Sequence, residues 1–126
     1  QLQIKEKLKI EEELRLKRHK RIKLRMWGTQ DKPRLVVHRS LKNISAQVLD
    51  DTEGKVLVSL STKDKTVRQK FSRAGNIQAA EAFGELFAQL AKDKGIKKVI
   101  FDRAGYLYHG RIKSFAEALR KGGMEF

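Results

Sequence analysis

The chain has 126 residues, the size of one ordinary domain with a tail, and 40% of them are hydrophobic, which is enough for one core. It contains no cysteine, which excludes disulfides and thiolate metal sites, and no apolar run approaches the roughly 20 residues of a membrane span. Its 29 Lys and Arg against 15 Asp and Glu give a net charge of +14, so we expect a polyanionic partner.

Residues 1–29 are predicted to form a basic helical arm, followed by a globular domain over residues 30–126. Good helix formers fill residues 1–14, and the block from Arg15 to Arg25 contains seven Lys or Arg and no acid. The apolar residues of this acid-free block keep no single helical stripe, so we expect a helix that its partner orders. A solvated helix face is the alternative, but an acid-free block of this length favours binding to phosphates.

Three short strands are predicted next, as an antiparallel meander. A hinge at 28–33 ends the arm, and the β-rich residues 34–39 form the first strand. Apolar residues alternate onto one face in a second strand over 44–49 and in a third over 56–60. The turn at 50–54 between them contains a glycine that permits positive φ.

The second half of the chain adds two helices and a fourth strand. Residues 61–75 are polar and are expected to form a surface loop. Asn76 is a suitable N-cap for an amphipathic helix that ends near Lys94. The strand at 97–101 follows a helix and should therefore lie parallel to a neighbour, while Ser114 starts a last helix with capping-box spacing. The predicted fold is a single α/β domain of order βββαβα, with the helices packed on the sheet.

The segment 102–111 is the strongest candidate for a binding site, because it follows the fourth strand, where open α/β sheets place their ligands. It contains two Tyr, one His, two Arg and two Gly in ten residues. Aromatic rings stack on unpaired bases, guanidinium groups bind phosphates, and glycines permit close backbone approach. The alternative is a loop in which a tyrosine fills the edge of the core. We expect that role for one of Tyr106 and Tyr108, and RNA contact for the cluster as a whole.

A second candidate group flanks the first strand and its turn. Its members are Arg34, Arg39, Ser40, Lys42 and Asn43. Composition alone gives equal weight to solvated strand ends and to binding. Gln47 lies out of phase with the apolar face of the second strand, so it should point away from that face, toward a ribose or a base edge.

Catalysis finds little support in the sequence. There is no Walker-type loop and no His-x-x-x-His pair, and the three histidines belong to different segments. A metal-dependent nuclease using Asp102 is one alternative, although an Asp at a strand end more often forms a salt bridge or caps the next turn. The nuclease alternative predicts RNA cleavage that is lost in the Asp102→Asn variant. Another alternative is an arm that binds membranes, which predicts liposome binding that does not need residues 34–126. We predict no enzyme, no cofactor, no metal and no small-molecule substrate.

Four stretches resemble the bacterial-type ribosomal large-subunit protein eighteen family. They are Lys32–Ser40, Ala46–Asp51, Val99–Arg111 and the ending Gly123–Phe126, and the third is highly specific. The resemblance implies a protein that binds 5S rRNA and attaches it, beside 23S rRNA and neighbouring ribosomal proteins, in the central protuberance of the large subunit. It implies the ribosome of a bacterial cytoplasm, a plastid stroma or a mitochondrial matrix.

Carried over by position, the resemblance implies RNA contacts in three parts of the chain. From the arm they are Arg18, Lys20, Arg21, Lys23 and Arg25, to which the acid-free block adds Arg15; from the first signature Arg34, Arg39, Ser40, Asn43 and Gln47; from the second Tyr108, His109 and Arg111. The sequence departs from the family pattern at Ala104, where glycine is usual, and at Ser45, where tyrosine is usual.

Overall fold

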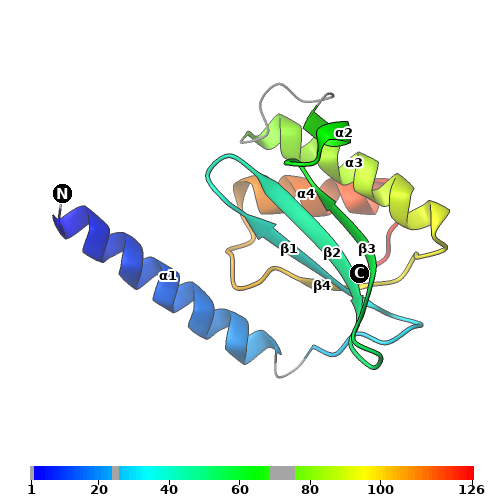
Figure 1. Ribbon diagram of the computed structural model, residues 1–126, viewed down its shortest axis with the longest axis horizontal. Helices are drawn as coiled ribbons and strands as arrows, with labels where there is room; N and C mark the ends of the chain where they lie inside the picture. The colour runs from blue at the N-terminus through cyan, green and yellow to red at the C-terminus, as the bar shows by residue number, and fades with distance from the viewer. Residues whose placement is uncertain (1, 24–25, 69–75) are drawn as a thin grey trace.

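The fold is built on a four-stranded sheet, and a computed structural model describes it for residues 2–23, 26–68 and 76–126 (Figure 1). The elements in chain order are α1 (Leu2–Lys23), β1 (Arg34–Arg39), β2 (Ile44–Asp50), β3 (Lys55–Ser61), α2 (Lys65–Arg68), α3 (Ile77–Asp93), β4 (Ile100–Asp102) and α4 (Gly110–Lys121).

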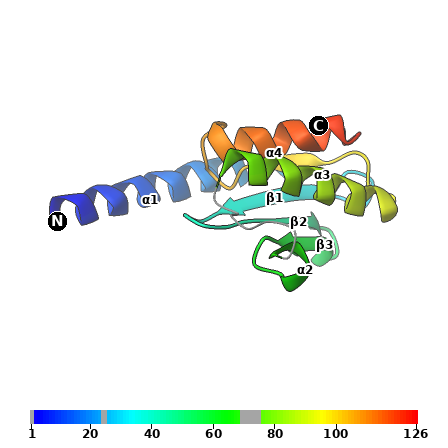
Figure 2. The ribbon, with the colours of Figure 1, turned by 90° about the horizontal axis from the view of Figure 1, so that it is seen from above.

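The strand order in the sheet is β3-β2-β1-β4. β2 pairs antiparallel with both β1 and β3, whereas β4 pairs parallel with β1. Parallel pairing needs a crossover connection, which α3 supplies. Helices α3 and α4 pack together on one face of the sheet (Figure 2). The predicted α/β fold, with its meander, parallel fourth strand and N-terminal helix, is confirmed.

The core lies between this face of the sheet and the two helices. Three phenylalanines, Phe83 and Phe87 of α3 and Phe115 of α4, are fully buried, with ring centroids 5.5 to 6.3 Å apart. Alternate residues of β1 and β2, such as Val37 and Val48, pack beneath them. Burial of one such side chain stabilises the fold by about 1.5 to 3 kcal/mol, so these rings fix how the helices sit on the sheet.

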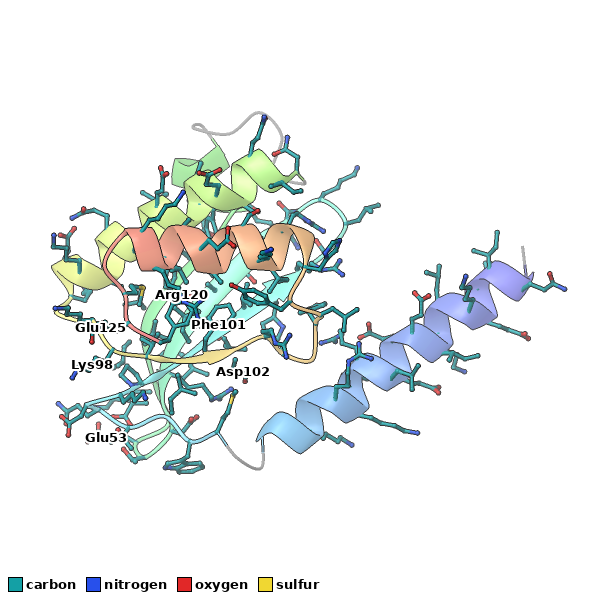
Figure 3. All side chains as sticks on the ribbon, turned by 180° about the vertical axis from the view of Figure 1, so that it is seen from behind. Glu53, Lys98, Phe101, Asp102, Arg120 and Glu125 are labelled. Atoms are coloured by element: carbon teal, nitrogen blue, oxygen red, sulfur yellow. The ribbon has the colours of Figure 1, made fainter. Side chains whose placement is uncertain are left out.

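The C-terminal segment returns alongside β4. Glu125 forms a parallel β-bridge with Lys98, and the Phe126 ring stacks on Phe101 with their centroids 5.0 Å apart. The Arg120 guanidinium lies 4.4 Å from the centroid of the Phe126 ring. Figure 3 shows Phe101, Arg120 and Glu125 close together beside β4. The last residues therefore extend the sheet edge and cover part of the core.

Two helix predictions differ in outcome. Asn76 caps α3 as predicted, and its side chain accepts a hydrogen bond from the Ala79 amide at 2.7 Å. The predicted start of α4 at Ser114 is wrong, because the helix begins at Gly110. Ile112 is fully buried on the core side of that extra turn, and this packing outweighs the local capping signal.

The polar segment 61–75, predicted to be a loop, contains the short helix α2, whose Val67 is buried in the core. Residues 69–75 of the predicted loop lie outside the described residues.

Helix α1 extends away from the sheet (Figure 1). The described side chains of α1 are exposed except those of Arg15 and Arg18, which are half-buried. The predicted helical arm is therefore a helix over 2–23, while the division of the chain at residue 29 stays a prediction.

Gly84 permits the close approach of α3 and α4, and the variant Gly84→Ala tests whether this position has room for a side chain. A Cβ at this position would lie 2.7 Å from the Ala118 Cβ and 2.8 Å from the Phe115 carbonyl oxygen. Alanine favours helix by about 1 kcal/mol over glycine, but overpacking costs about 1 to 3 kcal/mol. We expect a net loss in the free energy of unfolding, measured in urea. Glu85→Ala, on the exposed side of α3, is the control and should change stability by less than about 0.5 kcal/mol.

Candidate nucleic-acid interface

A buried guanidinium joins β1 to the end of β4. The Nη1 of Arg34 donates to Oδ2 of Asp102 at 2.8 Å, and Arg34 is 7% exposed while Asp102 is fully buried. The other carboxylate oxygen, Oδ1, accepts the Ala104 amide at 2.8 Å. Asp102 therefore forms the salt bridge and caps the following turn, the two roles predicted as the common ones, with Arg34 as its ion partner. Figure 3 shows Asp102 at the end of β4.

The same guanidinium fixes the root of the arm. The Nε and Nη2 of Arg34 donate to the Asp51 carboxylate at 2.9 and 3.0 Å, and the hydrogen bond with Asp51 raises the pKa of Arg34. Asp51 in turn accepts the Gly28 amide at 2.8 Å and donates its own amide to the Gly28 carbonyl at 2.9 Å. A Cβ on Gly28 would lie 2.3 Å from the backbone nitrogen of Arg34, so only glycine fits at this position.

Arg34 therefore has a structural role. Its RNA contact stays a prediction, but its Nε, Nη1 and Nη2 already donate to two carboxylates inside the fold.

Residues 103–109, which we call the arm-binding loop, contact α1. Ala104 and Gly105 have φ of +54° and +81°, the left-handed region that a residue with a Cβ adopts at a cost. Arg15 donates from Nη1 to the Ala104 carbonyl at 2.6 Å, and Arg18 donates from Nε to the Gly105 carbonyl at 3.0 Å. Two arm cations predicted to bind RNA thus also hold α1 against the domain.

Tyr106 lies at the centre of this contact. The guanidinium carbons of Arg15 and Arg39 lie 4.5 and 4.9 Å from the centroid of its ring, within the range of cation–π attraction. Its hydroxyl donates to the Arg39 carbonyl at 2.9 Å, and its ring packs against the core. Tyr106 is thus the tyrosine that fills the core edge, as predicted for one of the two, whereas Tyr108 is 36% exposed.

Arg111 holds the β1–β2 turn against the start of α4. It donates from Nη2 to the Ser40 carbonyl at 2.7 Å and from Nη1 to the Asn43 carbonyl at 3.5 Å. Burial, and secondarily the charge of Arg39, lowers the pKa of Arg111. Two candidate segments distant in the sequence, the first strand's turn and the second signature, are therefore adjacent in space.

A hollow of about 180 Å³ opens beside this turn. It is lined by His38, Arg39, Ser40, Asn43, Ile44, Ser45, Ser61 and Lys63. Three of the predicted RNA contacts, Arg39, Ser40 and Asn43, thus share one concave polar surface. Lys63 belongs to it too, and sequence reasoning missed this residue because its segment had no pattern beyond polarity.

The remaining predicted site residues are dispersed. Lys20 is exposed on α1, His109 is exposed at the start of α4, and Gln47 is half-buried on the sheet face that points away from the core. The side chains of Arg21 and Lys23, and the whole of Arg25, lie outside the described part of the chain. RNA contact at these positions stays a prediction.

The described ranges also bear on metal ligation and on membrane-spanning helices. Among those residues, no group of three His, Asp or Glu could hold a metal ion. No described helix combines the length and the apolar character that crossing a membrane requires. What the described residues offer is a cationic, partly aromatic surface, the kind that a nucleic-acid-binding structural protein presents.

The comparisons with known proteins agree with that class. The family described as "Ribosomal L18 of archaea, bacteria, mitoch. and chloroplast" matches residues 9–126. The protein named large ribosomal subunit protein uL18 from Acetivibrio thermocellus is 53% identical over 112 residues, covering 89% of this chain and 92% of its own. The uL18 protein of Kosmotoga olearia is 50% identical over 114 residues, covering 90% of this chain and 93% of its own. The uL18 protein of Acidobacterium capsulatum is 53% identical over 113 residues, covering 90% of this chain and 92% of its own.

The chain belongs to the ribosomal L18 family. It is a structural, non-enzymatic protein of the large subunit of the bacterial-type ribosome, and it works in translation within a ribonucleoprotein. Ribosomal RNA and other ribosomal proteins are its partners.

Removal of the Arg34 guanidinium should be severely destabilising. Arg34→Met would remove the guanidinium that donates to the buried Asp102 at 2.8 Å, and breaking a buried pair in this way costs about 3 to 5 kcal/mol. Chemical denaturation monitored by circular dichroism measures the loss. Lys55→Met removes a cation from an exposed pair with Glu53 and should cost less than about 1 kcal/mol. Equal losses in the two variants would contradict the structural role of Arg34.

Proposed function

We propose that this protein binds 5S rRNA and helps to attach it to 23S rRNA in the central protuberance of the large subunit. One observation carries the proposal: cations from the arm, from the end of β1 and from the second signature converge around Tyr106. The guanidinium groups of Arg15 and Arg39 lie over the ring of Tyr106, and Arg18 donates to the Gly105 carbonyl beside it. Arg111 donates to the Ser40 carbonyl, next to Arg39. The segments that resemble the 5S rRNA-binding family therefore form one surface.

The charged groups of this surface divide into two kinds. The guanidinium groups of Arg34 and Arg111 donate hydrogen bonds to other groups of the protein, so their main effect is to fix the shape of the surface. Lys20, Arg39 and Lys63 are exposed and are suited to neutralise phosphates, each releasing condensed counterions. Their exposure supports phosphate contact as the source of affinity.

Selectivity should come from shape and from unpaired bases. The deep major groove of an A-form helix is too narrow for side chains to read. Tyr108 and His109 are exposed at the end of the arm-binding loop, where rings could stack on bases that have left the helix. The hollow beside Arg39 has the polar lining that a ribose or a phosphate requires.

The affinity for 5S rRNA should depend on where the cations lie on the protein and not only on their number. For the double variant Arg39→Ala/Lys63→Ala, which removes two phosphate contacts, we expect the slope of log K against log salt to fall by about 1.4 to 1.8. The control Lys92→Ala/Lys121→Ala removes the same charge from exposed positions at the C-terminal ends of α3 and α4, and its slope should change far less. Fluorescence titrations with labelled 5S rRNA at several salt concentrations measure both slopes.

Competition with tRNA tests the identity of the RNA. Intact protein should prefer 5S rRNA over tRNA at physiological salt, because shape as well as charge is recognised. Equal affinity for the two RNAs would contradict the proposal and leave only a general polyanion binder. Equal slopes in the two double variants would show that the charge acts without regard to position.

A further inference from the structure

We propose that Trp27, at the junction of the arm and the domain, is an RNA-binding residue whose indole stacks on an unpaired base of the bound rRNA. The inference rests on the proposed function and deepens it, because it concerns how the same RNA is held. It assigns a role to a residue that neither the sequence patterns nor the family resemblance singled out. Stacking of this kind tolerates any base, since every base has a π face.

The first observation is the exposure of the indole. Trp27 is the only tryptophan of the chain, and it is 62% exposed. Among the described Phe, Tyr and Trp residues it is the most exposed, and Tyr108 follows at 36%. Tryptophan is highly buried on average and is enriched at interfaces, because its large ring gains much from being covered. The ring of Trp27 is therefore a surface for a partner and not a part of the core.

The second observation is that the backbone beside the indole is anchored to the domain. Gly28 donates its amide to the Asp51 carboxylate at 2.8 Å and accepts the Asp51 amide at 2.9 Å. The same carboxylate accepts from the Arg34 guanidinium. The domain thus presents Trp27 from a fixed point, and a tryptophan side chain has only two χ angles to order. Binding through this ring therefore costs little conformational entropy.

The third observation is the cationic block that precedes the ring. The acid-free block at 15–25, with its seven Lys or Arg, ends two residues before Trp27. Lys23 is four residues away, so at most about 14 Å separates the two Cα atoms in a fully extended chain. An RNA strand whose phosphates contact the end of the block therefore brings its bases close to the indole. Cations along the backbone combined with an aromatic ring for the bases are typical of sites for unpaired nucleic acid.

The carboxylates around the junction favour an RNA strand over a basic protein segment, because cations balance them. The Asp51 carboxylate accepts two hydrogen bonds from Arg34, and Glu53 forms an ion pair with Lys55 at 3.1 Å. The exposed Asp31 is followed directly by a lysine in the chain. Little net negative charge is left near the ring to repel phosphates.

The intrinsic fluorescence of the full-length protein tests the contact directly, because it reports on Trp27 alone among tryptophans. Binding of 5S rRNA should quench the emission and lower the quenching by acrylamide, a neutral probe, about twofold, since stacking covers one of the two faces of the ring. A fully paired RNA duplex offers phosphates but no unpaired base, so it should bind and leave the acrylamide quenching almost unchanged. This measurement needs no substitution.

Substitutions test whether the contact contributes to affinity. Trp27→Ala should weaken binding to 5S rRNA about 5- to 150-fold, the range expected for the loss of one stacked base. The slope of log K against log salt should stay the same, because no charge is removed. Trp27→Leu keeps apolar bulk without a π face and should lose nearly as much affinity, whereas Trp27→Phe should recover most of it. The matched control is Ile77→Ala, at a residue 53% exposed at the start of α3, and it should bind like the unsubstituted protein.

Four results would separate this inference from its alternatives. Unchanged acrylamide quenching in the 5S rRNA complex, or unchanged affinity in Trp27→Ala, would overturn the inference and leave the proposed function standing. Shielding of the indole only after assembly into the large subunit would assign the ring to a protein partner and would also overturn it. Equal shielding by 5S rRNA and tRNA, bound with equal affinity, would support base stacking while the proposed function fails.

Discussion

The Arg34 guanidinium is the interaction on which the rest of the interface depends. It binds Asp51, which holds the root of the arm at Gly28, and it binds Asp102, which caps the turn that presents carbonyls to the arm. The root of the arm and the loop that contacts α1 are therefore both linked to the same buried guanidinium. Buried ion pairs contribute little net stability because desolvation offsets their attraction, so the value of this network lies in the geometry that it imposes.

This arrangement divides a strongly basic chain into cations that shape the surface and cations that remain available to a polyanion. Arg34 and Arg111 are planar donors directed at carboxylates and carbonyls, a task for which a guanidinium is better suited than an ammonium group. The exposed cations include Lys20 and Lys63, compact charges on flexible stems. Net charge alone predicts a polyanionic partner, but only the structure separates these two kinds of cation.

The sequence predicted most of the fold, because hydrophobic alternation and the Asn76 cap are local signals that agree with the tertiary structure. It failed at the start of α4, where burial of Ile112 outweighs a capping box. Within the site it predicted the segments but not their pairing: nothing local shows that Arg34 meets Asp102, or that Tyr106 lies against Arg15. Those contacts join residues 68 to 91 positions apart, beyond the reach of periodicity and spacing.

Hydrogen exchange at two amides tests the central claim, that one guanidinium fixes both the root of the arm and the loop that binds it. The Gly28 amide donates to Asp51 and the Ala104 amide donates to Asp102. In Arg34→Lys, which keeps the charge but loses the fork of donors, we expect both amides to exchange at least tenfold faster while the amide of Val37 in β1 stays protected. Faster exchange at only one of the two, or at neither, would contradict a shared anchor.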